Sequence, residues 1–485
     1  MAGTFGNVSG MTRTATRDIP PELAAQMTPT VRAFILALFA EIDQLRAEVH
    51  DLKGQLADRR PTPENSSLPP STQHPHAKPT PTRPRSRKKR GGQVGHPKHT
   101  RALLPTDDCD RVVPLAPTAC RRCHAVLTGT DPTPLRHQVW ELPEIKPVVT
   151  EYQRHRLPCD CGATTCADLP SGVPLGQSGP RLVAFTGLLM AYFRQSKRRA
   201  ALFLDALLGQ PCCAALAVKM QHQVTAALRP TYDALVAQLP SQPHLGIDES
   251  PTKQAAAKAW LWTFVAKWFT AFAIRPTREA TILDDLLSDA FGGVVVCDRA
   301  KMYWQVGRLQ WCWAHLKRDI QALIDSSDSQ VTRLGHDLMR PTRELFRQWS
   351  RCRDGTIARA ELQRVLSPVR QTVDALLLRG VFSGNERLVG MCRELYAHRD
   401  WLWTFLDHDG VEPTNNASER SLRHAVIWRR LSFGTQSERG SRFVETMLSV
   451  IETCRQQKRN VFAFVTAAVE AHFARRTAPL LLARV

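Results

Sequence analysis

The sequence has 485 residues, enough for several domains with sizeable cores, and its 65 Lys and Arg against 45 Asp and Glu give a formal net charge of +20. This charge favours a polyanionic partner, and DNA, RNA and membrane surfaces are all compatible with it. No apolar run reaches the roughly 18 residues of a membrane span, and no apolar segment of a secretion signal follows the N-terminus. Thirteen cysteines without such a signal indicate reduced thiols, and we expect a cytoplasmic, nucleoid-associated protein.

The N-terminal region predicts a coiled coil. Residues 1–30 are polar and aperiodic, and we expect them to be disordered. Over residues 31–58, apolar residues recur at alternating spacings of four and three, mostly with leucine at the d positions. We expect a helix that joins two or more copies of the chain, although an amphipathic helix packed on its own domain would show a similar pattern. The seam consists of Val31, Ile35, Leu38, Ile42, Leu45, Val49, Leu52 and Leu56.

Residues 59–104 are rich in proline and basic residues and predict an extended linker. From Arg59 to Arg101 there are eleven Lys or Arg against one acid. A charge run is often only solvated, but the net charge of the chain favours contact with a DNA backbone or minor groove here. The predicted DNA-binding residues of the linker are Arg85, Arg87, Lys88, Lys89 and Arg90.

Residues 105–170 predict a zinc-binding region, because two close cysteine pairs suit a tetrahedral structural site. The pairs are Cys120 with Cys123 and Cys159 with Cys161, and strands expected at 138–142 and 148–152 would bring them together. The second pair is a tighter CxC, so Cys166 or His124 is an alternative ligand. Unpaired cytosolic cysteines are the competing interpretation.

Residues 171–240 predict a helical DNA-binding domain. Helices are expected at 182–193, 197–208 and 212–228, and a Gly209-Gln210-Pro211 turn separates the last two. Short turns of this kind occur in helix-turn-helix motifs and equally in any helical bundle.

Residues 241–318 predict the first part of an α/β catalytic core. Strands at about 245–248, 259–266 and 269–274, a helix at 281–287 and a strand at 293–298 follow the order of a ribonuclease-H-like fold, and a short strand at 309–312 leads into a helix. Two of these strands end in acids, Asp248 and Asp298.

Residues 319–407 read as a helical insertion with helices at 333–349, 360–378 and 386–405, of which Pro341 and Pro368 should kink or split the first two.

Residues 408–485 predict the C-terminal helices of the core. Asn415 or Asn416 is expected to cap a helix that holds Glu419. Final helices at 442–457 and 461–475 should pack on the sheet. Arg420, Arg423 and Arg430 are predicted to bind DNA.

Three acids suit a site for Mg²⁺ (or Mn²⁺), which prefers oxygen ligands and can activate water or a DNA 3′-hydroxyl in phosphodiester chemistry. We expect Asp248 to bridge two ions and Asp298 to hold one. The residues alone leave the third acid open among Glu419, Glu412, Glu438 and Glu445. His315 is either a core histidine or a neighbour of the site.

The chain resembles transposases of the insertion sequence 66 family over about residues 31–473. The resemblance implies a DDE transposase that uses Mg²⁺, selects Glu419 as the third acid, and supports the zinc region, the N-terminal zipper-like helix and accessory partner proteins. Three departures are Ser250 for a threonine, the CxC spacing, and Arg299 after the second acid. The motifs that carry it are Asn65-Ser66-Ser67, Gly91-Gly92-Gln93-Val94-Gly95-His96, the cysteine pairs, Asp248-Glu249-Ser250, Cys312-Trp313-Ala314-His315, Asn415-Asn416-Ala417-Ser418-Glu419-Arg420, Trp428-Arg429-Arg430-Leu431-Ser432-Phe433-Gly434 and Gly440-Ser441-Arg442.

Two other functions compete with DNA transposition. An inactive copy would bind element ends and repress, and a nuclease of the same fold would hydrolyse DNA without joining it.

Overall fold

The computed structural model describes residues 26–58, 95 and 101–482. Most of the predicted segment 1–30 and of the linker 59–104 lies outside the described residues. The five basic residues predicted to bind DNA in that linker lie outside them too: Arg85, Arg87, Lys88, Lys89 and Arg90.

A long helix, α2 (Pro29–Asp58), coincides with the predicted heptad segment. None of its described side chains is buried, and apolar ones such as Phe34 (64% exposed) and Leu45 (53%) face solvent. The helix is therefore as predicted, whereas its pairing with a second copy stays a prediction.

The cysteine region differs from the expectation. Residues 138–142 and 148–152 form no strands, and their apolar side chains, including Val139 and Val148, are exposed. Alternating apolar and polar residues form a strand only where a neighbouring strand pairs with them and a core buries their apolar face. Among the described residues, neither a pairing strand nor a core is present here. The hairpin lies further on, where β1 (Arg156–Pro158) pairs with β2 (Thr164–Cys166), and a 3₁₀ turn, η2 (Thr106–Asp108), comes earlier.

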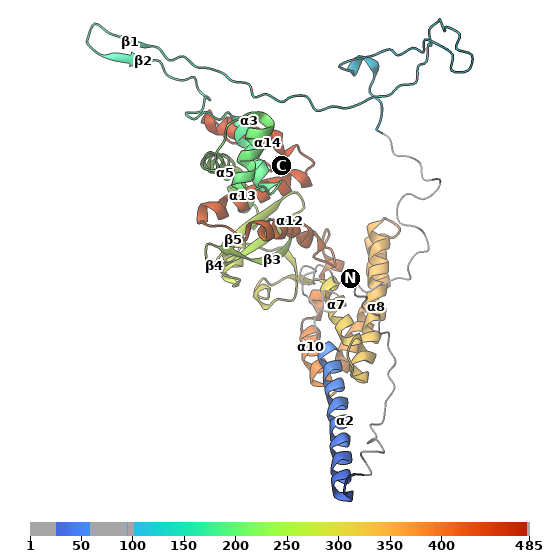
Figure 1. Ribbon diagram of the computed structural model, residues 1–485. Coiled ribbons are helices and arrows are strands. Elements are labelled where there is room, and N and C mark those ends of the chain that lie inside the picture. The colour runs from blue at the N-terminus through green and yellow to red at the C-terminus, as the bar shows by residue number, and fades with distance from the viewer. Residues whose placement is uncertain (1–25, 59–94, 96–100, 483–485) are drawn as a thin grey trace.

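A five-stranded mixed sheet has the strand order β5-β4-β3-β6-β7. Figure 1 shows β3, β4 and β5 between the helices α3, α5, α13 and α14 and the helical insertion. The first three strands in sequence are antiparallel, while β6 and β7 run parallel to β3. This confirms an α/β core. The strands are β3 (His244–Gln254), β4 (Ala257–Val265), β5 (Thr270–Arg275), β6 (Val294–Cys297) and β7 (Leu309–Trp311). The crossover from β5 to β6 contains α6 (Thr281–Leu287), and η3 (Lys301–Tyr303) follows β6.

Helices from both ends of the described core pack together beside β5. The helices before the sheet are α3 (Pro180–Ala191), α4 (Lys197–Leu208) and α5 (Ala214–Ala237), and those after it are α13 (Glu438–Gln456) and α14 (Val461–Phe473). Of the final two helices, only α13 lies along the sheet, at β5, whereas α14 packs against α3 and α5. The expectation that both cover the sheet is therefore wrong for α14, because its apolar face is buried against α3 and α5. One apolar core continues from these helices through the sheet.

The insertion is helical, as predicted, and its helices pack on one another and on α7 (Trp313–Ile324). Pro341 and Pro368 each lie inside one unbroken helix, so neither proline splits its helix. The helices are α8 (Ser329–Arg353), α9 (Arg359–Val381) and α10 (Glu386–Ala397), followed by η4 (Arg399–Leu402) and α11 (Thr404–Asp407).

Candidate active site

The two aspartates lie side by side at neighbouring strands. Strands β3 and β6 are parallel, and Gly246 on β3 is paired with Val296 on β6. Asp248 and Asp298 each lie two residues further along, so they occupy adjacent positions at the two strands. Asp248 lies within β3, and Asp298 directly follows the last residue of β6. The sheet therefore brings together two acids that are far apart in the sequence.

Helix α12 (Asn416–Ser432) brings Glu419 to the aspartates from its first turn. Asn415 occupies the N-cap position, but its side chain makes no cap hydrogen bond, contrary to the expectation. Its Nδ2 instead donates to the carbonyl of Ile247 at 2.7 Å, one residue before Asp248. This bond uses the amide to fix α12 on β3, which sets the position of Glu419.

Asp248 lies in strong negative potential. Burial raises the pKa of its carboxyl well above the ordinary value, and the nearby charges of Glu249, Asp298 and Glu419 raise it further. One carboxylate oxygen, Oδ1, accepts the backbone N–H of Glu249 at 2.9 Å. A site that crowds carboxylates in this way is suited to a bound cation.

Asp298 shows the same arrangement, because its Oδ1 accepts the backbone N–H of Ala300 at 2.9 Å. Its second oxygen, Oδ2, lies 4.0 Å from Nη2 of Arg278. Each aspartate thus has one oxygen held by the backbone, which orients the carboxylate and leaves the other oxygen for a ligand.

Glu249 points to the opposite side of β3 from Asp248, as successive strand residues do. Its side chain is only 3% exposed and is held by the hydroxyl of Tyr303 and the guanidinium of Arg278. Burial raises the pKa of this carboxyl, and Asp298 adds to the rise, while Arg278 lowers it. Glu249 therefore anchors Arg278 beside Asp298.

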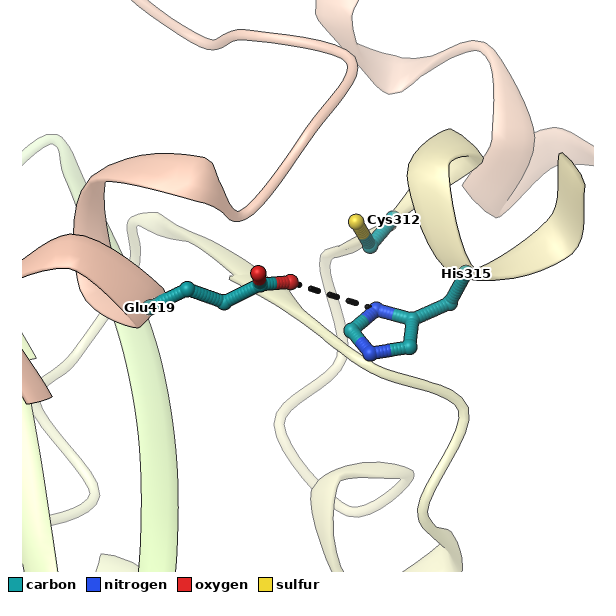
Figure 2. A group of neighbouring side chains, drawn as sticks. All are labelled: Cys312, His315 and Glu419. Carbon is teal, nitrogen blue, oxygen red and sulfur yellow. Dashed lines mark ion pairs between the residues drawn. The ribbon is translucent and has the colours of Figure 1, made fainter. Parts of the chain in front are cut away.

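Glu419 faces the start of α7 (Figure 2). Its Oε1 lies 3.7 Å from Nδ1 of His315 and 3.5 Å from Nη2 of Arg318. Both Oε1 and the histidine Nδ1 are buried atoms without a hydrogen-bond partner. His315 is thus a neighbour of the site, and burial lowers its pKa, with a further lowering by Arg318.

The competing glutamates lie elsewhere. Glu412 and Glu438 are exposed. Glu445 is fully buried at the far strand of the sheet, where it accepts the N–H of Ile274 at 3.0 Å. The geometry therefore agrees with Glu419 as the acid that joins the two aspartates.

Arg299, the residue after Asp298, connects the site with the helical insertion. Its guanidinium contacts Asp319 on α7 at 2.6 Å and Glu394 on α10 at 3.2 Å. The basic residue at this position is therefore accommodated by two acids and does not enter the carboxylate cluster.

The predicted DNA-binding residues of α12, Arg420, Arg423 and Arg430, are all exposed. Arg429 differs, because its Nη1 donates to Ser250 Oγ at 2.8 Å and to the carbonyl of Pro251. The hydroxyl of Ser250 thus accepts a hydrogen bond from Arg429, which is a second contact that holds α12 on β3.

The structure does not bring the predicted zinc ligands together. Among the described residues, no three cysteines from these two pairs have sulfur atoms within 4.8 Å of one another. Each pair is nevertheless arranged locally as a turn. Hydrogen bonds from the backbone of Cys123 and Arg122 lower the pKa of Cys120, and those from Cys161 lower the pKa of Cys159. Both turns therefore favour thiolates, the form that binds metal.

Several contributors to the site escaped sequence reasoning. Arg278 lies in a loop and Tyr303 in a short turn, and only the tertiary fold brings them to Glu249. Arg318 had a usable signal, because it lies three residues after His315 on a helix and so shares its face.

The carboxylate cluster fits a hard divalent cation. Asp248, Asp298 and Glu419 converge there, Glu249 adds its charge from the other side of β3, and Oε1 of Glu419 has no hydrogen-bond partner. Arg278 and Arg318 lie beside these acids. Carboxylate oxygens with open positions are the ligands that Mg²⁺ prefers.

Comparison with known proteins agrees with the resemblance. The family model described as "Transposase IS66 family" matches residues 176–442. Two proteins of Sinorhizobium fredii are similar: uncharacterized protein y4qI, 26% identical over 42% of this chain and 42% of its own length, and uncharacterized protein y4jO, 28% identical over 39% and 56%. The chain thus spans about half the length of these relatives.

Within the part of the chain that the structure describes, no helix combines the length and apolarity needed to cross a membrane.

Proposed function

Because the chain belongs to the IS66 family of transposases, we propose that it is a metal-dependent DNA transposase that cleaves element ends and joins them to target DNA by a DDE mechanism. The observation that carries this proposal is the convergence of Asp248, Asp298 and Glu419. The charges of Asp298 and Glu419 both raise the pKa of the Asp248 carboxyl. The sheet order and the parallel pairing of β3 with β6 also support a ribonuclease-H-like core.

In this proposal Asp248, Asp298 and Glu419 would hold Mg²⁺ or Mn²⁺, and the bound ion would supply Lewis-acid activation of an attacking oxygen and charge stabilisation of the leaving oxygen. Asp248 is the proposed shared ligand, because the charges of both Asp298 and Glu419 act on its carboxyl. Backbone N–H groups hold one oxygen of each aspartate and so preset the direction of the other. Arg278 and Arg318, beside the acids, are suited to contact the phosphate of the substrate.

DNA is the partner that a transposase implies. The exposed residues Arg420, Arg423 and Arg430 lie on the helix that carries Glu419, which supports contact with the backbone next to the cut site. The basic linker, the helices of residues 171–240 and a nucleoid location belong to the same proposal. Assembly through α2 into a dimer or larger oligomer is supported by its exposed apolar side chains, and accessory proteins are proposed from the family.

A structural Zn²⁺ held by Cys120, Cys123, Cys159 and Cys161, with Cys166 or His124 as substitutes, is also proposed. The turns around Cys120 and Cys159 support it, because their backbone hydrogen bonds lower the pKa of these two thiols. Binding both pairs to one ion requires residues 124–158 to fold back, so metal would organise this region on binding.

The test is Mg²⁺-dependent cleavage of DNA that contains element ends. We expect Asp248→Asn to lower the cleavage rate about 10³-fold, since a metal site contributes several kcal/mol at ~1.4 kcal/mol per factor of ten. Glu412→Gln, at an exposed acid outside the cluster, is the matched control and should cleave like the parent. Equal cleavage by Asp248→Asn and the parent would contradict the site.

A second assay separates the alternatives. With pre-cut 3′ ends, a transposase joins the ends to target DNA, whereas a nuclease gives no joined product. A repressor binds the ends but neither cleaves nor joins them.

A further inference from the structure

A second group of potential metal ligands adjoins the carboxylate cluster. Cys312 lies at the N-cap position of α7, His315 in its first turn, and Glu419 in the first turn of α12. One ligand atom from each lies within 4.8 Å of the other two (Figure 2). In the figure the glutamate carboxylate points at the imidazole, and the sulfur lies above the space between them.

Two of these atoms are unsatisfied. Nδ1 of His315 and Oε1 of Glu419 are buried, have no hydrogen-bond partner, and face each other at 3.7 Å. Buried polar atoms are nearly always hydrogen-bonded, whereas these two have only ion-pair contacts of 3.5 to 3.7 Å, which leaves room for a ligand between them. A tetrahedral ion with bonds of about 2.1 Å separates its ligand atoms by roughly 3.4 Å, close to the distance found here.

The chemistry of the three donors selects the ion. Sulfur, imidazole nitrogen and one carboxylate oxygen form a mixed set that suits Zn²⁺ and similar borderline ions, whereas Mg²⁺ requires oxygen ligands. The sulfur of Cys312 now accepts the backbone N–H of Asn415 at 3.2 Å, and as a zinc ligand it would release its proton to solvent.

We propose that Cys312, His315 and Glu419 form a zinc-selective site that shares Glu419 with the catalytic acids. This inference rests on the proposed function, because its consequence is that zinc competes with the catalytic metal ion for Glu419. Glu419 bound to zinc would no longer complete the magnesium site, so zinc would inhibit cleavage and hold α7 against α12.

The surrounding charges are compatible with a cation. Arg318 faces Glu419 and opposes binding, but Asp298 and Asp319 add negative charge near His315. Asp319 is itself partly neutralised by Arg299.

Cobalt(II) is the probe for the site, because it replaces zinc and gives a thiolate charge-transfer absorption. We expect the full chain to bind one more Co²⁺ than Cys312→Ser, a substitution that keeps the size of the side chain and a hydrogen-bond acceptor for Asn415. Cys392→Ser, at a buried cysteine on α10, is the matched control and should retain that ion. Equal Co²⁺ stoichiometry in the parent and Cys312→Ser would overturn the inference.

Inhibition gives the second readout. Zinc should inhibit Mg²⁺-dependent cleavage by the parent, and Cys312→Ser, compared with its own rate without zinc, should need at least about 10-fold more zinc for the same fractional inhibition, as loss of a ligand implies. Unchanged zinc sensitivity would also overturn the inference. If the parent does not cleave DNA at all, the proposed function fails while the Co²⁺ count still tests the site. Should Cys312→Ser not fold, His315→Gln must lose the same Co²⁺ ion.

Discussion

Asp248 shows how one residue combines structural cost with function. Its carboxyl lies partly buried beside three other acids, and both burial and repulsion raise its pKa. A protein without bound cations bears this repulsion in its folded state, so the charge that would hold metal weakens the fold. Destabilised groups of this kind are common at functional sites.

The first expectation concerns pH and stability without divalent cations. Since the folded pKa of Asp248 is raised, its contribution to stability is fully present below the ordinary pKa of 3.8 and is lost as pH rises through the folded value. Asp248→Asn keeps the acceptor for the N–H of Glu249 but not the charge. We expect it to melt at a higher temperature than the parent at neutral pH, and with less dependence on pH.

Thermal melts in EDTA from pH 4 to 8 measure this difference. Added Mg²⁺ should raise the melting temperature of the parent more than that of the variant, because only the parent keeps the full set of acids. A variant that melts below the parent in EDTA at neutral pH would contradict the assignment.

At the scale of elements, the position of α12 on β3 determines the site. Asn415 binds the carbonyl of Ile247, and Arg429 binds Ser250 and Pro251. Gly246 permits this close approach, because a Cβ at that position would lie 2.4 Å from Oγ of Ser418. The absence of a side chain at Gly246 thus matters as much as the acid two residues later.

Gly246→Ala should therefore displace α12 and lower Mg²⁺-dependent cleavage at least about 10-fold, because a shift of about 1 Å at a catalytic group has large effects on rate. The double variant with Ser418→Ala should recover much of the activity, since the Ser418 Cβ lies at an ordinary 3.8 Å. Ser418→Ala alone is the control and should be nearly neutral, because its buried hydroxyl has no partner. Cleavage by Gly246→Ala at the parental rate, or no rescue in the double variant, would contradict this account.

At the scale of the whole molecule, Glu445 joins segments that precede the sheet in the sequence with segments that follow it. Its buried carboxylate lies 3.3 Å from Arg229 on α5, 3.7 Å from Arg275 on β5 and 2.9 Å from Arg442 on α13. Burial raises its pKa, although Arg442 and the N–H of Ile274 oppose the rise. The cluster therefore ties the helices that precede the sheet to those that follow it.

Glu445→Gln should lower the free energy of unfolding by about 3 kcal/mol, since it leaves three arginines around a neutral side chain. Urea denaturation followed by circular dichroism measures the loss. Glu344→Gln removes an exposed pair with Arg347 and should cost less than ~1 kcal/mol. The folded fraction of Glu445→Gln should still cleave DNA, whereas loss of cleavage in fully folded protein would place Glu445 in the active site.

The spacing of apolar residues was sufficient to predict the strands of the core, the α2 helix and the helical insertion, because this spacing reflects which face each element buries. It failed at 138–142 and 148–152, where no core covers one face of the alternating pattern. At Asn415 it gave the N-cap position correctly but not the side-chain bond, because the amide binds β3 and not the helix N-terminus. The expected splits at Pro341 and Pro368 are wrong, since each proline lies inside one continuous helix.

By itself the sequence determined the family, the α/β core and the two aspartates at strands of that core, because ordered motifs and apolar strand patterns are local properties of the chain. Asp298 follows the end of its strand as predicted, but the expected strand end at Asp248 is wrong, because β3 continues to Gln254 through its pairing with β4. Residues alone left four glutamates as the third acid, and the family motif chose Glu419. Only the tertiary structure set Glu419 among the acids, Arg278 beside Asp298, and His315 and Cys312 against Glu419. These contacts depend on the parallel pairing of β3 with β6 and on a glycine that lets α12 approach, and neither can be read from one segment.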